Sequence, residues 1–476
     1  MVMSLILIIL FFPFCTSVDT LTPDQSIKDG QFLISNKNNF SLGFFSPGNS
    51  SYRYLGIWFV KVANQTIVWV ANRNDPIIDS SGVLSINPYG NLVLHDSSKR
   101  LLWSTNVSVQ GTTSSVAQLQ DSGNLVLVQG NNKKVIWQSF DHPTDTLLPG
   151  MRLGFNRKTG LDRFLTSWKS QDDPGTGDYF FKTNPIGSPQ VGLYKGSTLY
   201  WRSGPWPWPT SSSAATSSSS FKYYFVNNED EVSYNYFFDD AYIISRIVLH
   251  NSGLIQLLMW NDGDLQWKEF WSAPKYRCDN YRHCGAYGKC GPESDNRLNK
   301  FECTCLPGYE PKSPKNWYHR DGSEGCVRKQ LGLSMCGNGE GFVKVERLKG
   351  PDSFNAVWMD MSLSSSECEQ ACLRNCSCTA FVSVNIDGNG TSCLAWYGEL
   401  IDISENSLLR WDVNVRVDAT ELGGLLHLLA FFVNFHFCLF QLTDRGLMFF
   451  LFFVLQLLTQ GSPMVFLATR GSGLLQ

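Results

Sequence analysis

Cysteine is missing from the long stretch between Ser17 and Cys278, although the chain of 476 residues contains 14 cysteines. Twelve of them lie between residues 276 and 393. An even, clustered count is typical of secreted proteins, whose small loop-rich modules bury too little core to fold without covalent closure. The sequence therefore divides into a cysteine-free part, a block closed by disulfides and a hydrophobic tail.

An excess of charge of one sign is also missing. Lys and Arg number 39 and Asp and Glu 42, which gives a net charge of −3 without any basic run or stripe. This balance argues against nucleic acid as a partner. An aromatic content of 13%, with 15 Trp and 40 Gly, favours β-sheets joined by tight turns over helical bundles. We therefore expect a mostly β, multi-domain extracellular protein.

A catalytic constellation is missing as well. His319-Arg320-Asp321 matches the start of a kinase catalytic loop, but the residue five positions after the aspartate is Cys326 instead of a metal-binding asparagine. Neither a Ser/His/Asp set nor a pair of carboxylates at catalytic spacing stands out. The sequence predicts no enzyme, no cofactor and no metal site.

The residues at the N-terminus indicate that the protein is exported. Residues 1–17 form a short apolar run that ends in small residues, which is typical of a signal peptide cleaved after Ser17, although its usual basic start is missing. N-glycosylation sequons agree with that compartment. They lie at Asn39, Asn49, Asn64, Asn106, Asn375 and Asn389.

An internal repeat organises the first domain. Gly90–Leu94 recurs as Gly123–Leu127, and each copy runs on to a tryptophan, Trp103 and Trp137. Trp69 lies one further period of 34 residues upstream. Three such units predict a pseudo-threefold arrangement of small sheets whose tryptophans meet on a shared axis. A sandwich with coincidental repeats is the alternative.

Three segments in this region carry a resemblance. NNFSLGFFSPGNSSYRYLGIWF (38–59), TIVWVANRNDPI (66–77) and WQSFDHPTDTLLPGM (137–151) are similar to the bulb-type mannose-binding lectin domain of plant S-domain receptor kinases and S-locus glycoproteins. The resemblance continues through YWRSGPW (200–206) and the cysteine clusters, and covers about residues 19 to 420. It implies a β-prism for the lectin domain. The relatives it points to include serine/threonine kinases, but the sequence predicts no kinase domain here.

The resemblance implies a domain order, which we list by residue range. We expect a signal peptide (1–17), a bulb-type lectin domain (18–151), a second lectin-like unit with the S-locus glycoprotein region (152–272), an EGF-like module (273–330), a small α+β PAN/apple module (336–418) and a hydrophobic tail (423–458). Two interpretations of the tail stay open: a membrane anchor, or translation past the end of a conserved exon.

The sugar site of bulb lectins follows Q-x-D-x-N-x-V-x-Y on a strand. Alternate residues share one face, so polar groups converge on sugar hydroxyls while the valine packs on the ring. The third repeat keeps Gln120, Asn124 and Val126, but Ser122 and Val128 replace the aspartate and the tyrosine. The second repeat keeps Asn91 and Val93. These residues form either a degenerate site for a mannose-type glycan or ordinary positions of an inactive scaffold.

The cysteine block resembles two modules. The resemblance implies the pairs Cys278–Cys290, Cys284–Cys303 and Cys305–Cys326 for the EGF-like module, although six cysteines alone allow fifteen connectivities. For the PAN/apple module it implies Cys368–Cys393, Cys372–Cys378 and Cys336–Cys376. Lys275-Tyr276-Arg277 replaces the acidic pattern of calcium-binding relatives. Ser364 and Glu367 predict a capping box at the start of a short helix.

The sequence thus predicts the ectodomain of a plant S-domain receptor without its kinase, secreted or at the extracellular face of the plasma membrane. It would bind a carbohydrate or peptide ligand, and the family role is recognition of pollen or defence signalling. The alternative is a decoy or co-receptor subunit that binds no sugar. In either case we expect association with itself or with related receptors through residues 276 to 418, over an interface of about 1,200–2,000 Å² if it is stable.

Overall fold

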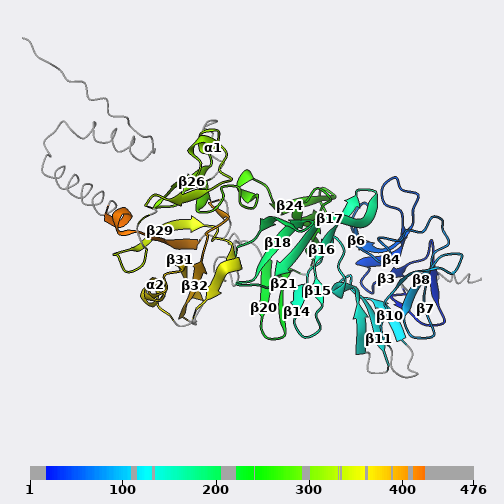
Figure 1. Ribbon diagram of the computed structural model, residues 1–476. Coiled ribbons are helices and arrows are strands. Elements are labelled where there is room, and N and C mark those ends of the chain that lie inside the picture. Colours follow the sequence, from blue (N-terminus) through cyan, green and yellow to red (C-terminus); the bar gives the residue numbers. More distant parts are fainter. Residues whose placement is uncertain are drawn as a thin grey trace, which may run out of the picture.

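The computed structural model describes residues 18–423 with several internal gaps (Figure 1). The gaps are 109–114, 131–133, 205–220, 241, 292–300, 331, 333–334, 360–362, 387–389 and 406–410. The predicted signal peptide, the Ser-rich segment 210–220, the sequon at Asn389 and all of the predicted tail except Gly423 lie outside the described residues. Within them, no helix has the length and apolar character needed to cross a membrane.

The first unit contains three four-stranded antiparallel sheets. Each sheet combines one short strand from the start of the chain with a three-stranded meander, and the pairing is nested: β3 joins the first meander, β2 the second and β1 the third. The strands are β1 (Thr20–Leu21), β2 (Ser26–Lys28), β3 (Leu33–Ile34), β4 (Phe40–Phe45), β5 (Tyr54–Phe59), β6 (Ile67–Val70), β7 (Val83–Ile86), β8 (Leu92–His95), β9 (Leu101–Ser104), β10 (Ser115–Leu119), β11 (Leu125–Gln129) and β12 (Lys134–Gln138).

The three repeat tryptophans meet at the centre of this unit, as the 34-residue period predicts. The ring centroids are 5.8 Å apart for Trp69 and Trp103, 5.5 Å for Trp103 and Trp137, and 6.1 Å for Trp69 and Trp137, all edge-to-face. Edge-to-face packing lets the positive rim of one ring meet the negative face of the next. The predicted pseudo-threefold axis is confirmed, and the alternative sandwich is wrong.

The second unit also contains three four-stranded sheets, two of which repeat the arrangement of the first unit, while the third has the order β15-β14-β21-β20. Short strands from residues 146–170 again pair with later strands in nested order, so that β16 joins β17, β14 joins β21 and β13 joins β22. The strands are β13 (Thr146–Leu147), β14 (Leu153–Asn156), β15 (Asp162–Arg163), β16 (Leu165–Ser170), β17 (Asp173–Asn184), β18 (Gln190–Lys195), β19 (Thr198–Arg202), β20 (Phe221–Asn227), β21 (Glu231–Phe238), β22 (Ser245–Leu249), β23 (Ile255–Asn261) and β24 (Gln266–Ala273). The three sheets form a second prism, and its likeness to a lectin stays a prediction.

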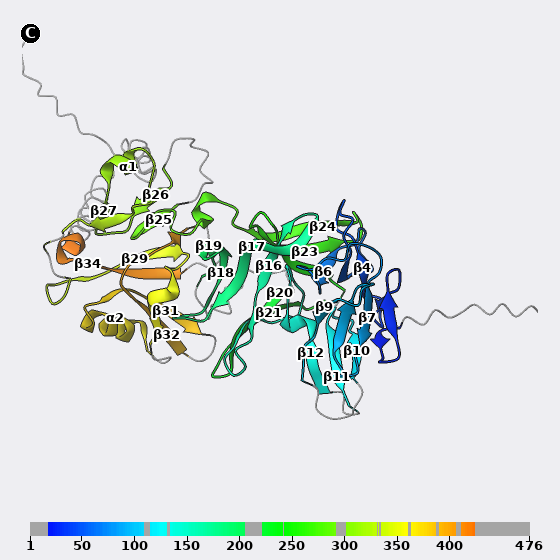
Figure 2. The same cartoon turned by 45° about the vertical axis from the view of Figure 1, so that its right-hand side comes forward.

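The two prisms lie side by side and share one hydrophobic core that extends from Leu21 to Ala273 (Figures 1 and 2). Arg73, just after β6, inserts into the second prism, where its guanidinium donates to the carbonyls of Ser167 at 2.7 Å and Pro174 at 2.8 Å. A buried guanidinium that satisfies several backbone acceptors fixes the two units relative to each other.

The cysteine block follows at the far end of the elongated molecule (Figure 2). Its first module contains β25 (Gly288–Cys290), β26 (Cys303–Cys305), β27 (Tyr309–Pro311), the short helix α1 (Pro314–Tyr318) and β28 (Cys326–Arg328). Its disulfides are Cys278–Cys290, Cys284–Cys303 and Cys305–Cys326, in the order that the EGF resemblance implies. His283 lies within 4.8 Å of two cysteine sulfurs, but both belong to these disulfides and offer no thiolate.

The second module is a five-stranded sheet with one helix packed against it. In spatial order the strands are β29 (Gly341–Leu348), β34 (Trp411–Val417), β31 (Cys378–Ile386), β32 (Gly390–Tyr397) and β30 (Ala356–Trp358). Helix α2 (Ser365–Arg374) begins with the predicted capping box, in which Ser364 and Glu367 satisfy each other's backbone N–H groups.

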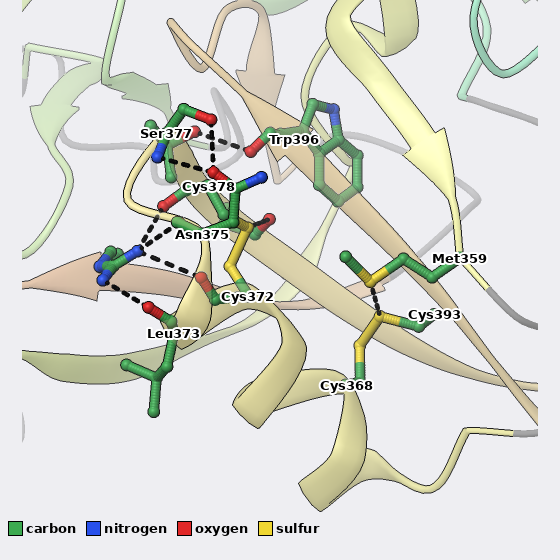
Figure 3. Close-up of a disulfide and its surroundings, with 12 residues drawn as sticks. Met359, Cys368, Cys372, Leu373, Asn375, Ser377, Cys378, Cys393 and Trp396 are labelled. Atoms are coloured by element: carbon green, nitrogen blue, oxygen red, sulfur yellow. Dashed lines mark hydrogen bonds between the residues drawn. A yellow bond between two sulfur atoms is a disulfide. The ribbon is translucent and has the colours of Figure 1, made fainter. Parts of the chain in front are cut away.

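Disulfides fasten α2 to the sheet from its buried face. Cys368 joins Cys393 on β32, and Cys372 joins Cys378 at the start of β31 (Figure 3). The third bridge of the module is Cys336–Cys376. These are the pairs that the PAN/apple resemblance implies. Two of the three disulfides join α2 to the sheet, and the third joins Cys336, before β29, to Cys376, just after α2.

The two cysteine modules form one body because they share a sheet. Strand β33 (Ile403–Ser404) of the second module pairs in parallel with β25 of the first, and β26 completes the three-stranded sheet. Because strand pairing has a defined register, it fixes how the two modules are positioned relative to each other.

Candidate functional site

The turn before β11 carries the first of the predicted sugar-binding residues. Gly123 N–H donates to the Gln120 carbonyl at 3.0 Å, and Gly123 has φ +84°. Glycine adopts this left-handed conformation without steric cost, which closes the hairpin tightly. The Gln120 side chain is exposed beside this turn.

Asn124 is committed to the fold. Its side-chain Nδ2 donates to Gln138 Oε1 at 3.0 Å, and its Oδ1 accepts from the Ser139 hydroxyl and the Phe140 backbone N–H, each at 3.2 Å. The residue is only 6% exposed. Since both ends of the amide already have partners within the protein, Asn124 holds the end of β12 against β11.

Asn91 repeats this arrangement in the second sheet. Its Oδ1 accepts from Val107 N–H at 2.7 Å and from the Thr105 hydroxyl at 3.0 Å, while Nδ2 donates to the Val107 carbonyl. Asn91 and Asn124 thus each bind the backbone sixteen residues further along. The repeated Gly-Asn is a structural staple in both sheets.

Val93 and Val126 are each 2% exposed and lie outside the shared core, although Leu92, Leu94, Leu125 and Leu127 belong to it. The valines therefore occupy the opposite face of their strands, where neighbouring side chains cover them. The structure brings Gln120, Asn124 and Val126 together around one hairpin end, but only Gln120 presents its side chain to solvent.

The described sequon residues differ in their surroundings. Asn49, Asn64, Asn106 and Asn375 are exposed. Asn39 is half-buried, and its Nδ2, the atom to which a glycan would be attached, donates to the Asp121 carbonyl at 3.2 Å. Asn39 therefore braces the turn next to Gln120. Glycosylation at these positions stays a prediction.

A cavity that the sequence did not indicate lies where the two prisms meet, with a volume of about 450 Å³. Its walls come from the segment after β4, the start of β6, the end of β16 and the end of β22. The cavity contains none of the five predicted sugar-site residues. It does contain Asp145, Arg246 and His250, whose side chains come together only in the folded chain.

Three family models match successive parts of this fold. They describe a D-mannose binding lectin over residues 66–169, an S-locus glycoprotein domain over 201–313 and a PAN-like domain over 336–403. Among solved structures, a monomeric monocot mannose-binding lectin from Gastrodia elata is 23% identical, with a TM-score of 0.20, and covers 25% of this chain and 96% of its own.

Relatives extend over most of the chain. The G-type lectin S-receptor-like serine/threonine-protein kinase RKS1 of Arabidopsis thaliana is 45% identical over 88% of this chain and 51% of its own length, so the chain spans about half of that kinase. The S-locus-specific glycoprotein S6 of Brassica oleracea is 37% identical over 87% of this chain and 95% of its own length. The S-locus-specific glycoprotein BS29-2 of Brassica oleracea var. alboglabra is 38% identical over 85% and 93%, respectively. The chain therefore belongs to the family of S-locus glycoproteins and G-type lectin S-receptor-like kinases, whose ectodomain it shares.

Proposed function

We propose that this chain binds a carbohydrate or peptide ligand through its two prisms, within the extracellular recognition role of its family. The observation that carries the proposal is the match to S-locus-specific glycoproteins over 93% and 95% of their own length, which are proteins of this domain composition. The D-mannose binding lectin model over residues 66–169 supports a glycan as one class of ligand. Six disulfides support an oxidising, extracellular setting, whether secreted or at the plasma membrane.

Binding of the full-length glycoprotein to an array of mannans and other plant and microbial glycans tests whether the ligand is a carbohydrate. Signal that survives deglycosylation of the protein and is competed by free sugar supports the proposal. Absence of signal for every glycan and for secreted peptide fractions would contradict it.

The second candidate is a decoy or co-receptor subunit that binds no sugar. The staple role of Asn91 and Asn124 favours it, because these amides are occupied within the fold and Ser122 and Val128 stand where bulb lectins carry aspartate and tyrosine. The shared sheet of β25 and β33 supports residues 276 to 418 as the associating part, since a rigid body loses little entropy on docking.

Co-expression with a full-length relative and pull-down tests this candidate. We expect recovery to require the block from 276 to 418. Equal recovery with a variant in which an unrelated disulfide-rich module replaces that block would contradict it.

A further inference from the structure

Two loops of the first prism form one side of the mouth of the cavity between the prisms. The residues that both line this cavity and are exposed form its rim, and they are Gly48, Gln65, Ser170, Gln171 and Asn251. The first two come from the first prism, and the other three come from the second. In both views β6 of the first prism lies beside β16 of the second (Figures 1 and 2).

Each of the two loops also touches the second prism. Gly48 packs so closely against the Asp172 carboxylate that no Cβ atom would fit between them. In the other loop, the Thr66 hydroxyl accepts a hydrogen bond from Trp267 Nε1 at 3.3 Å. These contacts hold both loops in place beside the cavity.

Both loops carry an N-glycosylation sequon directly beside the rim. Asn49 follows Gly48 in the chain, and Asn64 precedes Gln65. Consecutive Cα atoms are about 3.8 Å apart, so a glycan on either asparagine is attached one residue away from the cavity mouth. The sequence of the second prism contains no sequon. Glycans would therefore stand at the mouth on the side of the first prism only.

The side chains of Asn49 and Asn64 are accessible for glycosylation. Both residues are exposed, and neither side chain has a hydrogen bond to the residues that the structure describes. Asn39 differs, because its Nδ2 donates to the Asp121 carbonyl at 3.2 Å and its Oδ1 accepts from Lys61 Nζ at 2.9 Å. Attachment of a glycan to Asn49 or Asn64 therefore disturbs no hydrogen bond of the described part of the chain.

The cavity is small compared with the groups that would stand beside it. Its volume is about 450 Å³. An N-linked glycan consists of several sugar rings and is bulky and well hydrated. Two such glycans on one rim leave room for small solutes, whereas a loop of another protein would have to displace hydrated sugars to reach the cavity.

We propose that N-linked glycans on Asn49 and Asn64 screen the cavity between the prisms, so that small solutes reach it and protein partners do not. This inference goes beyond the proposed function, because it identifies a face of the molecule from which partner proteins are excluded. The block from 276 to 418, through which association is expected, lies at the far end of the elongated molecule (Figure 2).

Thiol labelling of a cysteine placed on the rim tests the proposal. Gln171→Cys puts a thiol on the second prism's side of the mouth. The background is Cys438→Ser, which removes the one cysteine that follows the twelve bridged ones. The labelling rate of a maleimide with a long polyethylene glycol chain is divided by that of N-ethylmaleimide. Because bulky glycans hinder the large reagent more than the small one, this ratio should rise roughly tenfold when both glycans are removed.

The glycans are removed in two ways, so that a folding defect cannot decide the result. The double variant Asn49→Gln/Asn64→Gln prevents their attachment, and treatment of the native secreted protein with a peptide N-glycosidase removes them after folding. Asn106→Gln is the matched control, because it deletes an exposed sequon that neither lines the cavity nor adjoins a rim residue. It should leave the ratio unchanged.

Mass spectrometry of the released peptides measures the occupancy of each sequon. We expect Asn49 and Asn64 to be occupied. Unmodified asparagines at both positions, a ratio that stays the same after glycan removal, or an equal rise in Asn106→Gln would each overturn the proposal. None of these outcomes depends on a ligand, so the glycan array and the pull-down test the proposed function separately.

Discussion

Arg202, at the end of β19, is ion-paired with Asp402 of the PAN-like module, and its Nε lies 2.8 Å from Asp402 Oδ2. The side chains are 0% and 4% exposed. The Nε–H is not aligned with the carboxylate, but both Nη2 bonds are well formed, to the carbonyls of Gly350 and Asp402 at 2.7 Å. Lys349 Nζ lies 2.8 Å from the same carboxylate. The Asp402 carboxylate thus contacts two buried cations where the second prism meets the cysteine block, and Asp352 lies close enough to Arg202 to interact with its charge.

Asp402→Ala should destabilise this junction strongly. Removing one member of a buried charge set leaves the others uncompensated, at a cost of about 3–5 kcal/mol. The midpoint of urea unfolding should fall accordingly. The control is Asp230→Ala, which removes the exposed pair with Lys158 and should cost about 0–1 kcal/mol. Equal midpoints for the two variants would show that the Asp402 carboxylate does not stabilise the junction.

Asn124→Ala should lower the stability of the first prism whether or not this protein binds sugar. It leaves the partly buried Phe140 N–H and the Gln138 side chain without their partner, which should lower the free energy of unfolding by about 1–3 kcal/mol, as measured by thermal unfolding. Gln120→Ala changes an exposed side chain and should stay within about 0.5 kcal/mol of the parent.

Asn124→Ala and Gln120→Ala together distinguish a structural role of the third repeat from a role in sugar binding. If the third repeat binds mannose, Gln120→Ala should reduce the signal on a mannan array at unchanged stability. A parent protein that gives no mannan signal, together with a destabilised Asn124→Ala, would leave Asn124 with a structural role only. An Asn124→Ala variant as stable as the parent would contradict the structural role of the Asn124 hydrogen bonds.

Removing the Cys372–Cys378 bridge as a double alanine variant should destabilise the PAN-like module. The bridge closes a loop with a sequence separation of only six, so the chain-entropy model gives a loss of about 2 kcal/mol. The separation of 25 in Cys368–Cys393 corresponds to a loss of about 3.5 kcal/mol. Secretion yield should follow that order. Thiol labelling of the native parent should find none of the twelve bridged cysteines reactive, and labelling of any of them would contradict the disulfide framework.

Acid should loosen the same module. Backbone N–H groups of Gly337 and Asn338, together with Arg416, lower the pKa of Glu340 to about 2 from its usual 4.5. Because the folded-state pKa is depressed, this stabilisation is complete above pH 4.5 and is lost as the pH falls from 4.5 towards 2. Unfolding midpoints between pH 6 and pH 2.5 measure it. Glu340→Gln should flatten the decline, and an unchanged slope would assign the acid sensitivity to other groups.

The features that repeat along the chain were predictable from sequence. The spacing of Trp69, Trp103 and Trp137 predicts their meeting, because equal periods place equivalent residues at equivalent positions of a symmetric fold. The capping box at Ser364 is a local pattern that needs only four residues. Family resemblance supplied the cysteine pairs, which spacing alone does not determine.

The role of Asn124 was not predictable in the same way. Its side chain suits a sugar hydroxyl and a backbone N–H equally well, and only the position of Phe140 in the fold decides between them. The cavity between the prisms could not be predicted from sequence, because the residues that line it lie far apart in the chain, from Phe45 to Asn251. One signal was present: His250-Asn251-Ser252-Gly253 has the same turn pattern as Gln120-Asp121-Ser122-Gly123.

The nested pairing of the short strands has a consequence for synthesis on the ribosome. Thr20 pairs with Gln118, in the last meander of the first prism, and Thr146 pairs with Val248, in the last meander of the second. The first strand of each prism therefore cannot pair until the last meander of that prism has been synthesised. The segment that emerges first is completed last, so each prism closes in one late step after nearly all of its residues have left the exit tunnel.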